Sequence, residues 1–138
     1  MEIRPFQTAD EAEIIALWQA CELTRPWNDP HKDILRKLAV RPEWFLVATI
    51  DGEIVGTVMA GFEGHRGWIN YLAVSAPHRR HGIGQALMLC AEKLLADANC
   101  PKINLQVRTA NKEAIEFYRA IGFSVDDVVS MGKRLQND

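Results

Sequence analysis

The chain has 138 residues with a formal net charge of −2, and 48% of its residues are hydrophobic and 25% charged. This length predicts a single domain over residues 1–138 with a hydrophobic core of its own. The slightly acidic balance argues against a general nucleic-acid-binding protein, although residues 78–81 form a local basic cluster.

The cysteines and the apolar runs bear on where the protein works. Cys21, Cys90 and Cys100 form no C-x-x-C pair, which favours a reducing compartment. The first residues lack the apolar stretch of a signal peptide, and no apolar run approaches the ~20 residues that span a bilayer. We therefore expect a cytoplasmic protein with no membrane partner. His78 and His81 share a loop with no acidic residue or cysteine beside them, so no metal site is expected.

In chain order, the apolar periodicity predicts an α/β domain with the element order β-α-α-β-β-β-α-β-α-β. Asp51 and Gly52 form a two-residue hairpin turn. The expected strands cover residues 3–6, 44–50, 54–62, 68–75 and 103–108, with one or two closing strands within 125–135. Four helices are expected. The first begins after a cap at Thr8 or Asp10, and the next two cover residues 31–39 and 83–98. The last begins after a cap at Asn111 and ends at Gly122.

The order of these elements also predicts how the sheet is built. The strands at 68–75 and 103–108 enclose a helix, so they form a βαβ unit with parallel strands and a right-handed crossover. The strands before them are joined by short turns and pair antiparallel. The sequence therefore predicts a mixed central sheet flanked by helices, antiparallel in its N-terminal half and parallel later.

The loop at residues 79–84 reads Arg-Arg-His-Gly-Ile-Gly and joins a predicted strand to a predicted helix. Glycines allow the backbone to approach an anion closely, and the N–H groups at a helix start face negative charge. This pattern indicates a pyrophosphate-binding loop; for the loop alone, a plain turn is the alternative. Gln85 and Ala86 replace the Lys-Ser/Thr pair of a Walker loop, and Leu87 replaces the small residue of a dinucleotide loop.

Two further residues make the likeness to a known family specific. Arg79-x-x-Gly82-x-Gly84, followed by Asn111 and Tyr118, resembles the signature of the GNAT family of N-acetyltransferases, and the likeness covers nearly the whole chain. The chain is most similar to small bacterial members called YpeA-like, which carry a loop like residues 25–30. The resemblance implies the GNAT fold, in which the two parallel strands splay apart, and acetyl-CoA as the acetyl donor.

The resemblance also implies a site and an acceptor. The acceptor would be a small-molecule or peptide amine; the oligomeric state is left open, with a homodimer as one alternative. A pantetheine arm would bond to the backbone of the strand at 68–75, and the loop at 79–84 would hold the pyrophosphate. The residues implied for acetyl-CoA binding are Leu72, Ala73, Val74, Arg79, Arg80, His81, Gly82, Ile83, Gly84, Gln85, Asn111 and Tyr118.

Tyr118 is the expected catalytic acid. It follows Asn111 by about two helical turns, so the two side chains lie near one face, and Tyr118 leans back toward the splayed strand ends. A phenol there can protonate a leaving thiolate; a core tyrosine bonded to a backbone carbonyl is the alternative. The acceptor amine must lose a proton first, and Glu63 is the candidate base, with a chain of waters as the alternative.

The loop at residues 25–30 is the candidate acceptor site. Trp27, Asn28 and Asp29 offer an aromatic ring, an amide and a carboxylate, which together suit a cationic amine. In the alternative interpretation Trp27 packs on the core and Asp29 caps the next helix. For the whole protein, the alternative to an enzyme is a non-catalytic acetyl-CoA-binding module, which would require neither Tyr118 nor Asn111.

Overall fold

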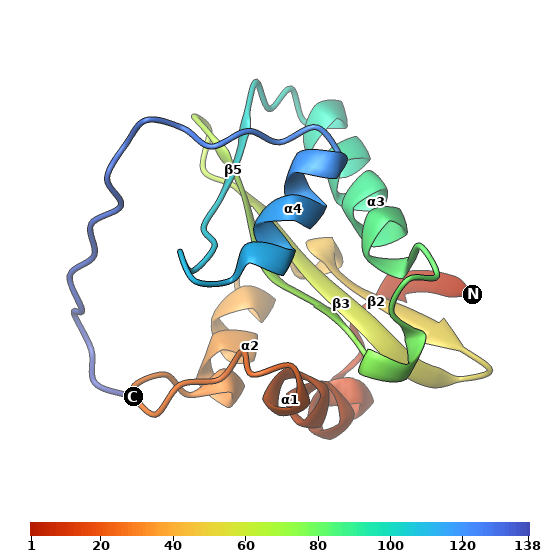
Figure 1. The fold of residues 1–138 in the computed structure, drawn as a ribbon. Helices are drawn as coiled ribbons and strands as arrows, with labels where there is room; N and C mark the ends of the chain where they lie inside the picture. Colours follow the sequence, from red (N-terminus) through yellow and green to blue (C-terminus); the bar gives the residue numbers. More distant parts are fainter.

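In the computed structural model, residues 1–138 form one five-stranded sheet covered by helices on both faces. The strands are β1 (Glu2–Pro5), β2 (Phe45–Ile50), β3 (Glu53–Phe62), β4 (Gly67–Val74) and β5 (Ile103–Leu105). The helices are α1 (Glu11–Ala20), α2 (Pro30–Leu38), α3 (Ile83–Asp97) and α4 (Lys112–Ala120). Figure 1 shows α1 and α2 on one side of the sheet and α3 and α4 on the other.

The sheet has the mixed topology that the sequence predicts. Its strands lie in the order β1-β2-β3-β4-β5; they pair antiparallel as far as β4, and β4 pairs with β5 in parallel. The β2–β3 turn has φ 49° at Asp51 and φ 79° at Gly52. Positive φ at both positions is what a type I′ turn requires, which confirms the predicted hairpin.

Each face of the sheet carries its own hydrophobic core because side chains alternate along a strand. On β2, Phe45 and Val47 pack with the buried residues of α1 and α2. Leu46 and Ala48 point the other way and pack with the buried face of α3. The sheet therefore separates two apolar clusters, and the elements of the candidate site are anchored in one or the other.

The parallel pair β4–β5 is short and open at one end. The two strands are in register only over Gly67–Ile69 and Ile103–Leu105, whereas β4 continues five residues further, to Val74. No backbone hydrogen bond joins residues 70–74 to the segment after β5. The strand predicted at 103–108 thus ends three residues early, and the edge of β4 beyond Ile69 has no partner strand.

The closing strands expected within 125–135 do not form, so that prediction was wrong. The tail from Ser124 to Asp138 has no regular secondary structure. Val125, Val129, Met131 and Leu135 share one face of an extended chain, but Asp127 and Lys133 lie on the same face and interrupt it, so no continuous apolar face is available to pack against the sheet. Five of them are 68–90% exposed: Val125, Val128, Val129, Met131 and Leu135. In Figure 1 the tail leaves α4 and returns to the loop before α2, standing away from the sheet.

None of the helices combines the length and the apolar character needed to cross a lipid bilayer. The histidine, cysteine and carboxylate side chains form no group of three or more that could hold a metal ion.

Candidate active site

The open stretch of β4 contains a β-bulge at Tyr71. The register with β3 shifts between Thr57 and Met59, so that Tyr71 and Leu72 together lie opposite Val58. Tyr71 has φ 51°, in the left-handed region that side chains other than glycine rarely adopt. A bulge turns backbone N–H and C=O groups away from the regular hydrogen bonds between strands. This bulge lies where β4 no longer pairs with β5, beyond Ile69.

A buried chain of hydrogen bonds holds this bulge in place. The indole N–H of Trp18 donates to the Thr57 hydroxyl oxygen (2.9 Å), and that hydroxyl donates to the Tyr71 carbonyl (2.8 Å). The rings of Trp18 and Tyr71 stack with their centroids 3.8 Å apart. Helix α1 thereby fixes the backbone geometry of β4 through side chains buried beneath the sheet.

Replacing Thr57 by valine is expected to lower the free energy of unfolding by about 2–6 kcal/mol. The change keeps the shape but leaves the Trp18 indole N–H and the Tyr71 carbonyl unpaired, at roughly 1–3 kcal/mol each. Thr57→Ser keeps the hydroxyl and loses one methyl group, roughly 1 kcal/mol. Chemical denaturation measures both variants, and equal losses would contradict a structural role for the hydroxyl.

The loop that follows β4 exposes the start of α3. Arg80 has φ 67° and Gly82 has φ 78°, and no side chain caps the helix. A Cβ added at Gly82 would meet no atom within 4 Å, so the backbone faces open space. The first N–H groups of a helix have no partner within the helix and attract anions. The candidate loop therefore offers free donors, as the sequence predicts.

The cationic side chains of this loop differ in their surroundings. The Arg79 Nε donates to the Val74 carbonyl (3.2 Å), which ties the loop to the end of β4. Arg80 and His81 are exposed. The His81 Nδ1 lies 3.1 Å from the His78 carbonyl oxygen. Arg80 is thus free to meet an anion from solvent.

Gly84 brings α4 close to the start of α3. A Cβ at Gly84 would lie 3.2 Å from the Phe117 ring and 3.5 Å from a Val74 methyl group. A larger residue would push Phe117 away, and with it the neighbouring Tyr118. The close approach explains why glycine is needed here even though Gly84 lies inside a helix.

Tyr118 lies half-buried in an aromatic cluster. Phe117 and Phe123 meet its ring edge-on at centroid distances of 5.2 and 5.7 Å. Burial raises the pKa of Tyr118 to about 12, and no hydrogen bond contributes to that shift. The phenol therefore keeps its proton at neutral pH and has no partner within the protein, unlike a core tyrosine bonded to a carbonyl. Asn111 caps α4, as predicted, accepting from the Ala114 N–H (3.2 Å).

Glu63 does not lie near this opening, which argues against its predicted role as general base. It stands in the β3–β4 turn, where its carboxylate accepts from the backbone N–H groups of His65 and Arg66. That turn adjoins the paired end of β4–β5. Leu72 lies five residues along the strand from Gly67, roughly 16 Å away. The carboxylate stabilises its own turn.

The loop at residues 25–30 combines parts of both interpretations. Asp29 caps α2, its carboxylate accepting from the His31 N–H (2.9 Å). Trp27 is 54% exposed, so it does not pack on the core. Asn28 donates to Asp33, and its amide lies 3.4 Å from the Tyr71 hydroxyl. The loop therefore reaches the bulge of β4 through Asn28 and leaves Trp27 available for contact.

Sequence reasoning missed a polar network below the bulge. The Tyr71 hydroxyl donates to Asp33 (2.7 Å), and Asp33 also pairs with Arg36 (2.8 Å). Burial and the neighbouring carboxylate raise the pKa of Tyr71 well above its usual range. The spacing of Asp33 and Arg36 predicts that they share one face of a helix, but no neighbouring residue in the sequence indicates that Asp33 contacts Tyr71.

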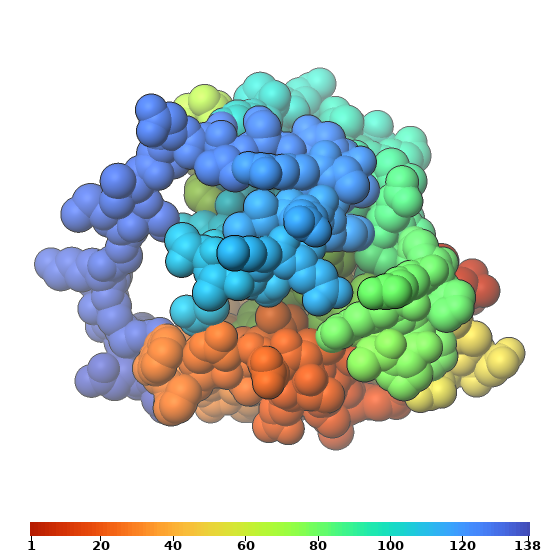
Figure 2. Space-filling view, in the orientation of Figure 1, coloured from red at the N-terminus to blue at the C-terminus, as the bar shows by residue number.

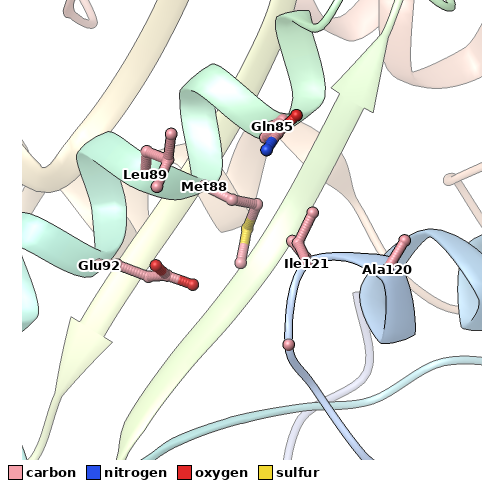
Figure 3. Close-up of a pocket in the computed structure, with 7 residues that line it drawn as sticks. Gln85, Met88, Leu89, Glu92, Ala120 and Ile121 are labelled. Carbon is pink, nitrogen blue, oxygen red and sulfur yellow. The ribbon is translucent and has the colours of Figure 1, made fainter.

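A separate groove runs between α3 and α4, with a volume of about 340 Å³. Figure 3 shows Met88 pointing into it from α3 and Ile121 facing it from the end of α4. Its lining residues are Gln85, Met88, Leu89, Glu92, Ala120, Ile121 and Gly122. The side chain of Gln85 is thus directed to this outer groove, so only its backbone belongs to the anion loop.

The splayed parallel strands and the open glycine-rich helix start are features of an acetyltransferase fold. The sequence pattern of the Acetyltransferase (GNAT) family matches residues 12–123, and the chain belongs to this family. An acetyltransferase of Yersinia enterocolitica is 48% identical over 135 residues, covering 98% of this chain and 96% of the relative. An acetyltransferase of Sodalis glossinidius is also 48% identical, over 139 residues, covering 100% of this chain and 98% of the relative.

Solved structures share the fold. Ard1 of Thermoplasma volcanium is 31% identical with a TM-score of 0.74, covering 91% of this chain and 83% of that one. Naa20 of Chaetomium thermophilum, solved in complex with a bisubstrate analogue, is 27% identical with a TM-score of 0.76, covering 91% of this chain and 72% of that one. The GNAT fold predicted from the sequence is thereby confirmed.

Proposed function

We propose that this protein transfers the acetyl group of acetyl-CoA to an amine by direct attack. The observation that carries the proposal is the unpaired edge of β4 between residues 70 and 74, which the loop at residues 75–82 joins to the uncapped start of α3. An extended pantetheine arm can bond to the backbone of Leu72, Ala73 and Val74, as an added strand would. The N–H groups of residues 79–85 then face the pyrophosphate.

The reacting groups would act as follows. The amine nitrogen attacks the acetyl carbonyl carbon, and a backbone N–H near Leu72, turned out by the bulge, stabilises the oxyanion. The carbon–sulfur bond breaks, and Tyr118 protonates the thiolate so that CoA leaves as the thiol. The amine passes its surplus proton to solvent through water, since Glu63 is engaged in its own turn. Asn111 supports this step by capping α4.

Thiol release in the presence of an amine panel tests the proposal. Acceptor-dependent release of CoA, with a matching gain of 42 Da on the acceptor (about the mass of an added acetyl group less one hydrogen), is expected for the enzyme. A non-catalytic binding module would bind acetyl-CoA in calorimetry and release no thiol with any amine. That second outcome would overturn the catalytic role and keep the cofactor site.

For the acceptor side, Trp27→Ala is expected to raise the KM for the acceptor about tenfold and leave the KM for acetyl-CoA nearly unchanged. Trp27 is exposed, so its loss costs little stability. Asp29→Asn should act in the same direction, because asparagine keeps the helix cap and loses only the charge. Val40→Ala, another exposed apolar residue, is the control. Wild-type acceptor kinetics in both loop variants would place the acceptor elsewhere.

A further inference from the structure

A carboxylate is bound beside the candidate acceptor loop, and it comes from the tail of the chain. The Asp138 side chain accepts from both terminal nitrogens of Arg36, at 2.7 and 3.2 Å. It also accepts from the backbone N–H of Asp29 (2.9 Å). The carboxylate is only 2% exposed, although most of the tail faces solvent. Two parallel bonds from a guanidinium and a third from an amide are a specific geometry for a carboxylate.

This receptor is held in position by residues of the site itself. Arg36 is oriented by Asp33, whose other oxygen accepts from the Tyr71 hydroxyl at the bulge of β4. Asn28 donates to the Asp33 carboxylate as well, which links the candidate acceptor loop to Asp33. The position of the guanidinium is thus coupled to the strand that would hold the acetyl group.

The tail itself gains little from its other contacts. Its apolar residues are exposed, and its other polar contacts are few: Lys102 with Asp126, Gln106 with Ser130, and two longer bonds near the acceptor loop, Arg134 with Asn28 (3.3 Å) and Arg36 with Gln136 (3.4 Å). Figure 2 shows an opening between the tail and the body of the protein, closed where the tail meets the loop before α2. The Asp138 carboxylate makes the shortest of the hydrogen bonds at the far end of the tail, at 2.7 Å to Arg36 and 2.9 Å to Asp29, and a competing carboxylate could replace it.

The surroundings of the receptor favour an anion. An open groove beside it is lined by Trp27, Arg36, Gly132, Lys133, Arg134, Leu135 and Gln136. Trp27 and Arg36 belong to the body of the protein and stay when the tail leaves, whereas the other two cations, Lys133 and Arg134, belong to the tail itself. With the tail displaced, the Arg36 guanidinium is left without its partner Asp138, and an amine that also carries a carboxylate can supply the missing negative charge.

We propose that Arg36 and the backbone N–H of Asp29 form a carboxylate-binding site for the acceptor, and that Asp138 occupies it until the acceptor binds. The substrate class is an amine that bears a carboxylate. The proposal rests on the acetyl transfer proposed above, because the amine end of this acceptor is the end that reacts. Its carboxylate can belong to an acidic side chain of a peptide or to a free amino acid.

Matched acceptor pairs test this site and distinguish the two sources. One pair is a tripeptide amide with glutamate or glutamine at its second position; the other is free alanine and alaninamide. In the pair that matches the natural source, the carboxylate-bearing member is expected to have a kcat/KM about tenfold higher than its neutral counterpart. A preference in the tripeptide pair indicates a peptide, and one in the alanine pair indicates a free amino acid. Arg36→Gln should bring that ratio close to one. Asp138→Asn should raise kcat/KM for the carboxylate-bearing acceptor about threefold or more and leave its neutral counterpart unchanged.

Arg66→Gln is the control for net charge, because Arg66 lies in the β3–β4 turn and bonds only to its own loop. It should keep the preference. Equal kcat/KM within both pairs would overturn the carboxylate site while leaving acetyl transfer intact. A lower melting temperature of Asp138→Asn without any kinetic change would mean that the contact only tethers the tail, which also overturns the proposal.

A readout without catalysis separates failure of this site from failure of acetyl transfer. In ¹⁵N-labelled protein, the glutamate tripeptide amide should shift the amide signals of residues 132–138 as it displaces the tail, and the glutamine peptide should not. Arg36→Gln should abolish the shift. Displacement without thiol release would keep the carboxylate site and refute the proposed transfer; no displacement by any carboxylate-bearing compound would refute the site.

Discussion

Gly82→Asp is expected to lower the affinity for acetyl-CoA at least ~100-fold, or about 2.7 kcal/mol. Gly82 has φ 78° at the start of α3, and the space in front of it is open. A carboxylate there can accept from the N–H groups of the first turn, and so takes the donors that the pyrophosphate needs while repelling it. Calorimetric titration with acetyl-CoA measures the loss.

Gly64→Asp is the control for this variant. Gly64 also has a positive φ, 103°, and open space around it, but it lies in the β3–β4 turn. Gly64→Asp therefore imposes similar backbone strain and the same charge at a distance, and should leave CoA affinity nearly unchanged. Unaltered affinity in Gly82→Asp would refute the assignment of the loop at 79–84 to the pyrophosphate.

Tyr118→Phe is expected to reduce kcat on the order of 100-fold and to spare acetyl-CoA binding. The phenol acts only as the thiolate leaves, so its loss affects the chemical step. The hydroxyl has no partner in the protein, and burial alone perturbs its pKa, so the melting temperature should hardly change. A raised KM for acetyl-CoA with an unchanged kcat would make Tyr118 a binding residue instead.

The raised pKa of Tyr118 also fixes the sign of the pH dependence. The acid must be protonated to act, and a pKa of about 12 keeps it so well above neutral pH. The acceptor amine must be deprotonated, with an unperturbed pKa near 8 for an α-amine and about 10.4 for a lysine. In pH–rate measurements kcat/KM should therefore rise with pH toward the amine pKa, with no fall assignable to Tyr118 below about pH 10.

The elements whose signals are local could be predicted from the sequence. The glycine-rich loop, the Asn111 cap and the hairpin at Asp51 each depend on a few adjacent residues, and each is found as expected. The mixed sheet followed from the βαβ order. The loop before α2 was also predicted, although each of its two interpretations holds only in part. Asp29 caps α2, as expected for a scaffold loop, and Trp27 is exposed, as expected for a binding loop.

What could not be predicted depends on contacts between distant residues. A bulge reverses the alternation of a strand, but residues 71–74 are all apolar, so the reversal at Tyr71 cannot be read from the sequence. The Arg36–Asp138 pair joins positions 102 residues apart. The hydrogen bonds of Glu63 to its own turn likewise could not be read from the sequence, in which a carboxylate at a strand end resembles a general base.

The division of the core into two clusters has a consequence for how such a protein diversifies. Substitutions among the residues beneath α3 affect the elements that lead to the cofactor loop, whereas those beneath α1 and α2 affect the acceptor loop. The sheet between them limits how far a repacking event on one face spreads to the other. If the proposed sites are right, acceptor preference can change during evolution while the acetyl donor stays the same, and the Trp18–Thr57–Tyr71 contact is where the α1 side fixes the backbone of the strand proposed to bind the donor.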